Sequence, residues 1–345
     1  MIKASIIGAT GYVGVELLRL LNNHKRVKID SLVSRSSAGK RVSDIYPQFK
    51  GNIDYQLKSF NINELKKSDI VFTALPHGVS QDIVAQLHHE GIKIIDMSGD
   101  YRYQDKNIYE KWYKIDHNHS QLLKKAVYGL AELNREKIKN AEIIANPGCY
   151  PTASLLALIP AVKANLVDKD FIIVDAKSGV SGAGKSLKEH LLFNEVDENI
   201  KAYSINNHRH TSEIENILQV VSSKENIKIS FTPHLIPMKR GILSTVYMKL
   251  LNNVTEDELI NIYKNTYDKT GFVKILTKTV PQTKYVYGTN YCHLGVKLDQ
   301  RTNRLVVISA IDNVGKGAAG QAVQNMNIIF DFPEDMGIKT TAVIP

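Results

Sequence analysis

Apolar and polar positions follow two rhythms along the first part of the chain. Short, mainly apolar runs predict buried strands at residues 4–8, 27–33, 69–75, 92–97 and 141–145. Between them, apolar side chains recur every three or four positions, which predicts helices over residues 12–22 and 79–88. Strands and helices that alternate in this way predict a parallel sheet with helices on both faces.

The second part of the chain predicts a different sheet. A sharp turn at residues 146–148 leads into a long apolar helix over 150–163, and a final helix over 317–329 is expected to return to the first domain. Further strands are predicted at residues 171–176, 227–235, 243–250 and 305–311. We therefore predict an α/β protein of two domains. The parallel-sheet domain comprises residues 1–148 and 313–345, and an α+β domain with a mixed sheet comprises residues 149–312.

Composition narrows the functional class. No apolar run approaches the roughly 20 residues that span a bilayer, and Met1 leads directly into a predicted strand, so we expect neither a membrane segment nor a leader. The two cysteines are too few for a disulfide framework and lack zinc-type spacing. We expect no metal site and a reducing compartment, the cytoplasm. The net charge of +9 is scattered, which argues against nucleic acid. Solvated surface lysines explain most of it, with a general bias toward small anionic ligands.

A glycine-rich turn lies between the first predicted strand and the first predicted helix. The segment Gly8-Ala-Thr-Gly11-Tyr-Val-Gly14 has the context of a dinucleotide-binding turn, in which backbone amides at a helix N-terminus approach a pyrophosphate. Its spacing is G-x-x-G-x-x-G rather than G-x-G-x-x-G. Cofactor contacts are expected from Gly8, Thr10, Gly11, Tyr12, Val13 and Gly14.

The residues after the second predicted strand bear on which dinucleotide is bound. A site for NAD commonly has Asp or Glu here for the ribose hydroxyls, whereas this chain has Ser34, Arg35 and Ser36. Hydroxyl and guanidinium groups suit a 2′-phosphate. We therefore expect NADP, bound in part by these three residues.

The turn at residues 146–148 places Cys149 where a strand ends and a helix begins. Helix-terminal amides favour a thiolate there and can stabilise an oxyanion, so Cys149 is the predicted nucleophile, whereas Cys292 is expected to be an inert core residue. A proton-handling partner is expected from the segment Asn207-His-Arg-His-Thr-Ser-Glu213. The residues alone leave open whether His208 or His210 acts.

A second glycine-rich segment competes with this interpretation. Gly179-Val-Ser-Gly-Ala-Gly184-Lys185-Ser186 matches the phosphate-binding pattern G-x-x-x-x-G-K-[ST], after a predicted strand and before a helical stretch. It would indicate a nucleotide triphosphatase or kinase. The match follows a complete dinucleotide-binding unit, however, and no nearby acidic residue is compelling for magnesium. We interpret it as a glycine-rich active-site loop.

Five segments together carry a resemblance to a known family. They are GATGYVG from Gly8, ANPGCYPT from Ala145, DAKSGVSGAGK from Asp175, NHRHTSEI from Asn207 and DNVGKGAAGQAVQN from Asp312. In this order, and over nearly the whole chain, they resemble the N-acetyl-γ-glutamyl-phosphate reductases of arginine biosynthesis, in the aspartate-semialdehyde dehydrogenase superfamily. The resemblance implies a Rossmann-type NADP domain, an α+β catalytic and oligomerisation domain, and a terminal helix that rejoins the first domain.

The resemblance also implies a reaction. Cys149 would displace phosphate from an acyl phosphate substrate, and NADPH would reduce the resulting thioester to the semialdehyde. His210 matches the family's acid/base histidine, and Glu213 would orient it. Further cofactor contacts are expected from Ser178, Gly179, Asn313, Lys316 and Gly317. Substrate contacts are expected from Arg102, Asn146, Lys185, His208, Arg209 and Arg240. A homo-oligomer, either a dimer or a tetramer, is expected as well.

Other functions stay open at this point. The same chemistry serves N-acetyl-aminoadipyl phosphate in lysine biosynthesis and aspartyl phosphate, and one methylene changes binding by only about 1–3 kcal/mol. A regulator that senses NADP without catalysis would share the dinucleotide turn. Such a regulator has no need of a nucleophile at a helix start.

Overall fold

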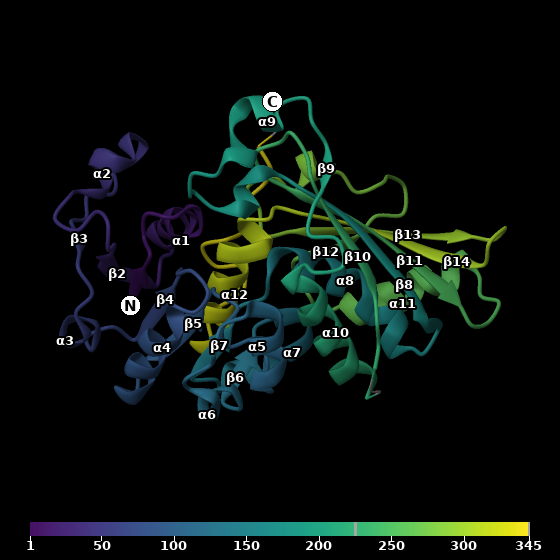
Figure 1. Ribbon diagram of the computed structural model, residues 1–345, viewed down its shortest axis with the longest axis horizontal. Helices are drawn as coiled ribbons and strands as arrows, with labels where there is room; N and C mark the ends of the chain where they lie inside the picture. Colours follow the sequence, from purple (N-terminus) through teal and green to yellow (C-terminus); the bar gives the residue numbers. More distant parts are fainter. Residues whose placement is uncertain (224–225, 344–345) are drawn as a thin grey trace. The chain divides into compact units, whose positions relative to one another are not determined.

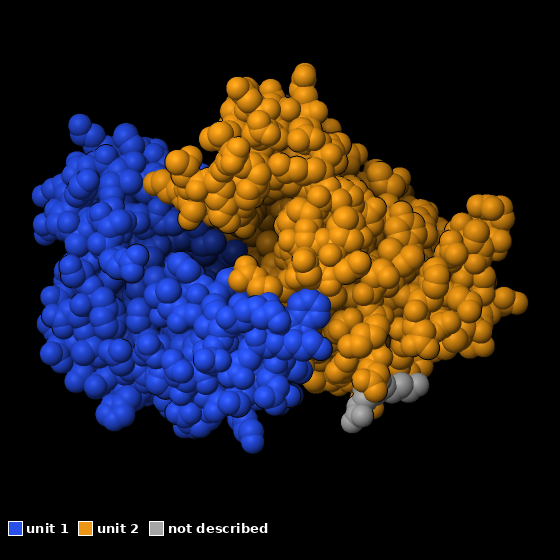
Figure 2. Space-filling model, viewed as in Figure 1, with its two compact units in different colours: residues 1–147, 318–339 blue, residues 148–317, 340–345 orange. Residues whose placement is uncertain are grey.

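The computed structural model describes residues 1–223 and 226–343 and divides the chain into two units. Unit 1 comprises Met1–Pro147 and Ala318–Lys339, and unit 2 comprises Gly148–Gly317 and the residues from Thr340 onward (Figures 1 and 2). The division of roles between residues 1–148 with 313–345 and residues 149–312 stays a prediction. Residues 344 and 345, at the end of the predicted range 313–345, lie outside the described part of the chain.

Unit 1 is built on a parallel sheet with the strand order β3-β2-β1-β4-β5-β7-β6. The strands are β1 (Ile2–Ile7), β2 (Val27–Val33), β3 (Leu57–Lys58), β4 (Ile70–Thr73), β5 (Lys93–Asp96), β6 (Ala126–Tyr128) and β7 (Ile143–Ala145). Strands β4 and β7 are buried at every position, as expected where helices cover both faces of a parallel sheet. The predicted parallel sheet is confirmed, and the predicted strand over residues 27–33 agrees to the residue.

The helices of unit 1 include one that comes from the end of the chain. They are α1 (Tyr12–Asn22), α2 (Val42–Ile45), α3 (Ile62–Leu65), α4 (Ser80–His89), α5 (Lys106–Tyr113), α6 (Ser120–Leu123), α7 (Ala131–Lys139) and α12 (Gly320–Ile329). Helix α12 packs against α1 and α7, which confirms the predicted return of the terminal helix (Figure 1). Its first predicted turn is instead a π-helix, Gly315–Ala319.

Unit 2 contains the predicted mixed sheet, with the strand order β12-β13-β14-β11-β8-β10-β9. The strands are β8 (Val167–Ser178), β9 (Lys201–Ala202), β10 (Ser230–Leu235), β11 (Ile242–Leu250), β12 (Val273–Ile275), β13 (Cys292–Asp299) and β14 (Arg304–Ile311). Helix α8 (Cys149–Lys163) is apolar on all sides and packs against this sheet, between it and α10 (Arg209–Ser222), while α11 (Glu256–Tyr267) packs beside it. No helix among the described residues is both long and apolar enough to cross a membrane.

One predicted element is wrong. The segment after Gly184 does not form a sustained helix but contains a 3₁₀ turn, Glu189–Leu191, and the four-residue helix α9 (Phe193–Val196). Gly184 has a φ of +79°, which breaks helical geometry directly after the preceding turn, Val180–Ala183.

Candidate active site

The glycines of the first turn in unit 1 differ in what requires them. Gly8 has a φ of +87°, and a Cβ added there would lie 2.2 Å from the carbonyl oxygen of Ala74. A Cβ on Gly14 would lie 2.3 Å from the carbonyl oxygen of Gly8, whereas one on Gly11 would meet that same oxygen at an ordinary 3.6 Å. The fold therefore needs Gly8 and Gly14. A Cβ at Gly11 would instead enter the space at the start of α1, where the sequence predicts that the backbone approaches a pyrophosphate.

The start of α1 also has the electrostatics of an anion site. Gly11 is the N-cap, in an extended conformation, and supplies no side-chain acceptor. The first turn, residues 12–15, contains no acidic residue. The positive end of the helix dipole is therefore not neutralised by a nearby carboxylate of that turn, which suits a pyrophosphate. These residues fit a dinucleotide.

The three residues after β2 fall into two environments. Ser34 is buried and its hydroxyl lies 3.0 Å from that of Thr10, which links the two turns of the predicted cofactor site. Arg35 and Ser36 are exposed. The predicted contact of Arg35 and Ser36 with a 2′-phosphate stays a prediction, with which the exposure of their side chains is consistent.

Cys149 is the first residue of α8 and is half-buried, outside any disulfide. Gly148 is the N-cap of this helix, and its first turn contains no acidic side chain, so the helix dipole favours the thiolate. Gly317 packs directly against it, because a Cβ on Gly317 would lie 2.8 Å from the Cβ of Cys149. Cys292, in contrast, is fully buried in β13, as predicted for a core residue.

His210 lies next to the residue that precedes the cysteine. A Cβ on Gly148 would lie only 2.5 Å from Nε2 of His210, so only glycine leaves room for the imidazole. His208, the N-cap of α10, accepts the N–H of His210 on Nδ1 at 3.1 Å. Burial, with the charge of Arg209, lowers the pKa of His208 to about 4. His208 is thus a neutral acceptor at physiological pH, which favours His210 for proton transfer.

Glu213 is buried one turn further along α10. Its Oε1 accepts the backbone N–H of Gly148 at 2.9 Å. The sequence predicts that Glu213 orients His210. The structure shows a further contact, because Glu213 also fixes the backbone of the residue that precedes the nucleophile. One helix, α10, therefore brings both an imidazole and a carboxylate to Gly148.

The predicted cationic contacts have different partners. Arg240 donates from Nε and Nη2 to Oδ1 of Asp312, at 3.1 and 2.8 Å, and Asp312 is fully buried. Lys316 is fully buried, with its ammonium 5.8 Å from the centre of the Phe272 ring. Lys185 and Arg209 are exposed.

Asn313 and Ser178 hold the loops of unit 2 rather than present exposed groups. Asn313 accepts the N–H of Gly241 on Oδ1 at 2.7 Å and donates from Nδ2 to the hydroxyl of Ser181 at 3.0 Å. Ser178 is buried and donates to the carbonyl of Gly179 at 3.0 Å. The sequence did not single out Asp312 or Gly148, because their roles come from partners far away in the chain.

The segment over residues 179–186 does not form a phosphate loop. The N–H groups of Gly179, Val180 and Ser181 donate to backbone carbonyls of residues 238–241, at 2.9 to 3.1 Å. In a phosphate loop such groups face the ligand. The N–H groups of Gly179, Val180 and Ser181 are therefore bonded within the protein, and no sustained helix follows the segment. These two observations rule out the nucleotide triphosphatase alternative and leave the interpretation as a glycine-rich loop.

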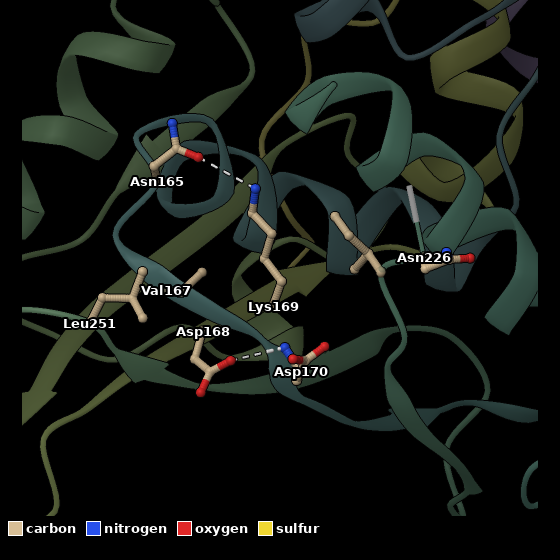
Figure 3. A pocket seen from close by; sticks show the side chains of 8 residues that line it. Asn165, Val167, Asp168, Lys169, Asp170, Asn226 and Leu251 are labelled. Atoms are coloured by element: carbon tan, nitrogen blue, oxygen red, sulfur yellow. Dashed lines mark hydrogen bonds between the residues drawn. The ribbon is translucent and has the colours of Figure 1, made fainter. Parts of the chain in front are cut away.

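Two cavities involve other residues. A cavity of about 480 Å³ in unit 2 lies around Asp168, Lys169 and Asp170 (Figure 3). A second, of about 550 Å³ in unit 1, is lined by residues of α4 and by His119, which pairs with Asp82 at 2.8 Å. Neither has a predicted site residue in its described lining. Within residues 1–223 and 226–343 there is no group of three or more His, Cys, Asp or Glu placed to hold a metal ion.

Comparison with known proteins gives one consistent result. Residues 3–141 match the family model described as semialdehyde dehydrogenase, NAD binding domain, and residues 149–313 match semialdehyde dehydrogenase, dimerisation domain. The chain is 58% identical to N-acetyl-gamma-glutamyl-phosphate reductase of Halothermothrix orenii over 347 residues, with 100% of both chains covered. It is 52% identical to the protein of that name from Acetivibrio thermocellus, with 98% of each covered.

Solved structures share the fold. Aspartate semialdehyde dehydrogenase II from Vibrio cholerae superposes with a TM-score of 0.74 at 20% identity, over 96% of this chain and 99% of that chain. Aspartate semialdehyde dehydrogenase with NADP from Candida albicans gives a TM-score of 0.69 at 18% identity, over 96% and 98%. At these identities the likeness shows the architecture alone.

Proposed function

This chain belongs to the N-acetyl-γ-glutamyl-phosphate reductase family, and from that membership we propose the reaction and the residues that perform it. The chain reduces N-acetyl-L-glutamyl 5-phosphate to N-acetyl-L-glutamate 5-semialdehyde with release of phosphate. Full-length identity of 58% to a reductase of this name carries the assignment. Cys149 at the start of α8, beside His210, supplies the chemistry that the reaction needs.

The first half of the proposed reaction is acyl transfer to sulfur. The Cys149 thiolate attacks the acyl carbon, the carbon–oxygen bond to phosphate breaks, and a thioester forms. An acyl phosphate already carries a good leaving group, so positioning and oxyanion stabilisation are the main requirements. The N-terminal amides of α8 are the proposed oxyanion donors.

The second half reduces that thioester. Bound NADPH supplies the hydride equivalent for this step. His210 donates a proton to the oxygen of the reduced carbon and takes it back when the carbon–sulfur bond breaks, which releases the semialdehyde and restores the thiolate. Glu213 fixes Gly148 and orients His210 during both halves.

We propose NADP as the cofactor in preference to NAD. The exposed Arg35 and Ser36 after β2, with no acidic side chain at residues 34–37, support recognition of a 2′-phosphate. The start of α1 would hold the pyrophosphate through the turn at Gly8, Gly11 and Gly14. Arg240 and Arg209 are the proposed anion contacts of the substrate, and the reaction is placed in arginine biosynthesis in the cytoplasm.

A homo-oligomer, dimer or tetramer, is part of the proposal. Helices α8 and α11 pack on one face of the sheet of unit 2. The opposite face carries half-exposed apolar residues, among them Ile173, Tyr247 and Val306, which lie directly opposite one another across β8, β11 and β14. An apolar cluster in the middle of a seven-stranded sheet supports burial against a second copy.

The reverse reaction tests this function and its substrate together. The enzyme is mixed with N-acetylglutamate semialdehyde, NADP and inorganic phosphate, and NADPH formation is followed by absorbance. Parallel assays use the N-acetyl-aminoadipate and aspartate semialdehydes. We expect phosphate-dependent reduction with at least a tenfold preference in kcat/KM for the glutamate compound. A higher kcat/KM for either analogue would show that the analogue is the substrate. NADPH formation that does not depend on phosphate would contradict the proposed reaction.

A further inference from the structure

We infer that Asn325 on α12 is a positioning residue for the turn that carries Cys149, and that it acts through Asn146. The inference rests on the proposed role of Cys149 as nucleophile. It gives helix α12, which belongs to unit 1, an indirect role in the reaction through the position of Cys149. It also gives Asn146 a role other than contact with substrate.

Every polar group of Asn146 is hydrogen-bonded inside unit 1. Its N–H donates to the carbonyl of Asp96 at 2.8 Å, and its carbonyl accepts Nε of Arg102 at 2.9 Å. Its side-chain Oδ1 accepts Nδ2 of Asn325 at 3.2 Å, and its Nδ2 donates to the carbonyl of Ala318 at 3.2 Å. The residue is 1% exposed. Four hydrogen bonds, to residues of 96–102 and of 318–325, fix both the backbone and the side chain.

Two chain segments lead from this cluster to the surroundings of Cys149. Only Pro147 and Gly148 separate Asn146 from the nucleophile, and the proline ring fixes one of the intervening backbone torsions. Ala318 follows Gly317, the residue whose backbone packs against Cys149 within unit 2. Asn146 therefore lies at one end of the first segment, and its side chain bonds to Ala318 at the end of the second.

Asn325 is suited to support Asn146 without being essential to its own surroundings. It is fully buried, and its Nδ2 also donates to the carbonyl of Gly129 at 2.8 Å. That carbonyl accepts a second bond, from Nε2 of Gln321 at 2.8 Å. Loss of the Asn325 amide thus leaves Gly129 with a donor but removes the donor to Oδ1 of Asn146. The effect of such a loss is concentrated on the turn.

The same helix provides a matched control. Asn327 is also fully buried, and its Nδ2 donates to the carbonyls of Glu334 and Met336, at 3.0 and 2.9 Å. Its Oδ1 lies 2.9 Å from Nε2 of His24. Replacement of Asn327 removes comparable bonds from unit 1, but none of these partners belongs to the turn of Cys149.

The experiment compares Asn325→Ala with Asn327→Ala, both in a Cys292→Ser background so that Cys149 is the only thiol. Three quantities are measured: the Tm, the rate of iodoacetamide alkylation from pH 5 to 10, and kcat with the KM for NADPH. We expect Tm to fall by several degrees in both variants. Only Asn325→Ala should move the alkylation profile to higher pH and lower kcat at least tenfold, with the KM for NADPH within twofold.

Two results would overturn the inference. One is an Asn325→Ala enzyme whose Tm is lowered but whose alkylation profile and kcat equal those of the Asn327→Ala enzyme. The other is additive loss of kcat in the double variant with Asn146→Ala, because two substitutions that remove one hydrogen bond should not add. If Asn325→Ala does not fold, Asn325→Ser is measured in its place. Alkylation of Cys149 does not require turnover, so it tests the positioning of the thiol even if the proposed reaction is wrong. The proposed reaction fails separately, if the Cys149→Ser enzyme is active.

Discussion

Two histidines separated by one residue have different environments at the start of α10. The imidazole of His210 lies against Gly148, while His208 uses Nδ1 to cap the helix and is surrounded by the rings of Tyr150, Tyr203 and Phe231. The lowered pKa of His208 follows from this burial. General acid–base catalysis is most efficient when the pKa of the group lies near the operating pH, so the lowered pKa of His208 disfavours it for this role.

Substitution by asparagine separates the two roles. His210→Asn removes the proton carrier, and we expect kcat to fall by about 10² to 10⁴ with little change in the Kd for NADPH. His208→Asn keeps a side chain that caps helices well, so kcat should fall less than tenfold. Steady-state kinetics and fluorescence titration with NADPH provide both measurements. A larger loss of kcat in the His208 variant would reverse the assignment.

Among the elements, the turn from β1 to α1 shows how one motif combines requirements of the fold with those of the ligand. An added Cβ at Gly8 or Gly14 would clash with backbone atoms, whereas one at Gly11 would not. We expect Gly11→Ala to retain a Tm within a few degrees of the parent while the Kd for NADPH rises at least tenfold. Gly14→Ala should lower Tm sharply, because its Cβ meets a backbone oxygen. Differential scanning fluorimetry and NADPH titration check both, and normal NADPH affinity of Gly11→Ala would contradict the assigned site.

The elements with strong apolar patterns were predictable, because such patterns report burial locally, whereas α5, α7, α11 and β13 were not predicted. The helix over residues 12–22 and the strand over 27–33 agree with α1 and β2 at both ends. Side-chain partners were not predictable. Gly148 with Glu213, and Arg240 with Asp312, are brought together only by the fold. The helix expected after Gly184 failed for a local reason, a left-handed glycine followed by a segment with exposed apolar residues and little packing.

At the scale of the whole molecule, self-association is expected through the face of the unit 2 sheet that carries the half-exposed Ile173, Tyr247 and Val306. Tyr247→Glu places a charge between Ile173 and Val306, in the centre of that face. We expect this variant to dissociate in light scattering at micromolar concentration, because burial of an unpaired carboxylate opposes association. Val220→Glu, at an exposed position of α10, is the control and should leave the assembly intact. Equal masses for Tyr247→Glu and the parent would locate the interface elsewhere.

The central claim is that the reaction passes through a thioester on Cys149, and a pre-steady-state burst tests it most directly. The enzyme is mixed with N-acetylglutamate semialdehyde and NADP in the absence of phosphate, so the acyl group has no acceptor other than slow hydrolysis. We predict a burst of one NADPH per active site and an N-acetylglutamyl adduct located on Cys149 by mass spectrometry, both absent in Cys149→Ser, which still binds NADPH. Turnover without a burst, or an adduct on another residue, would contradict the account.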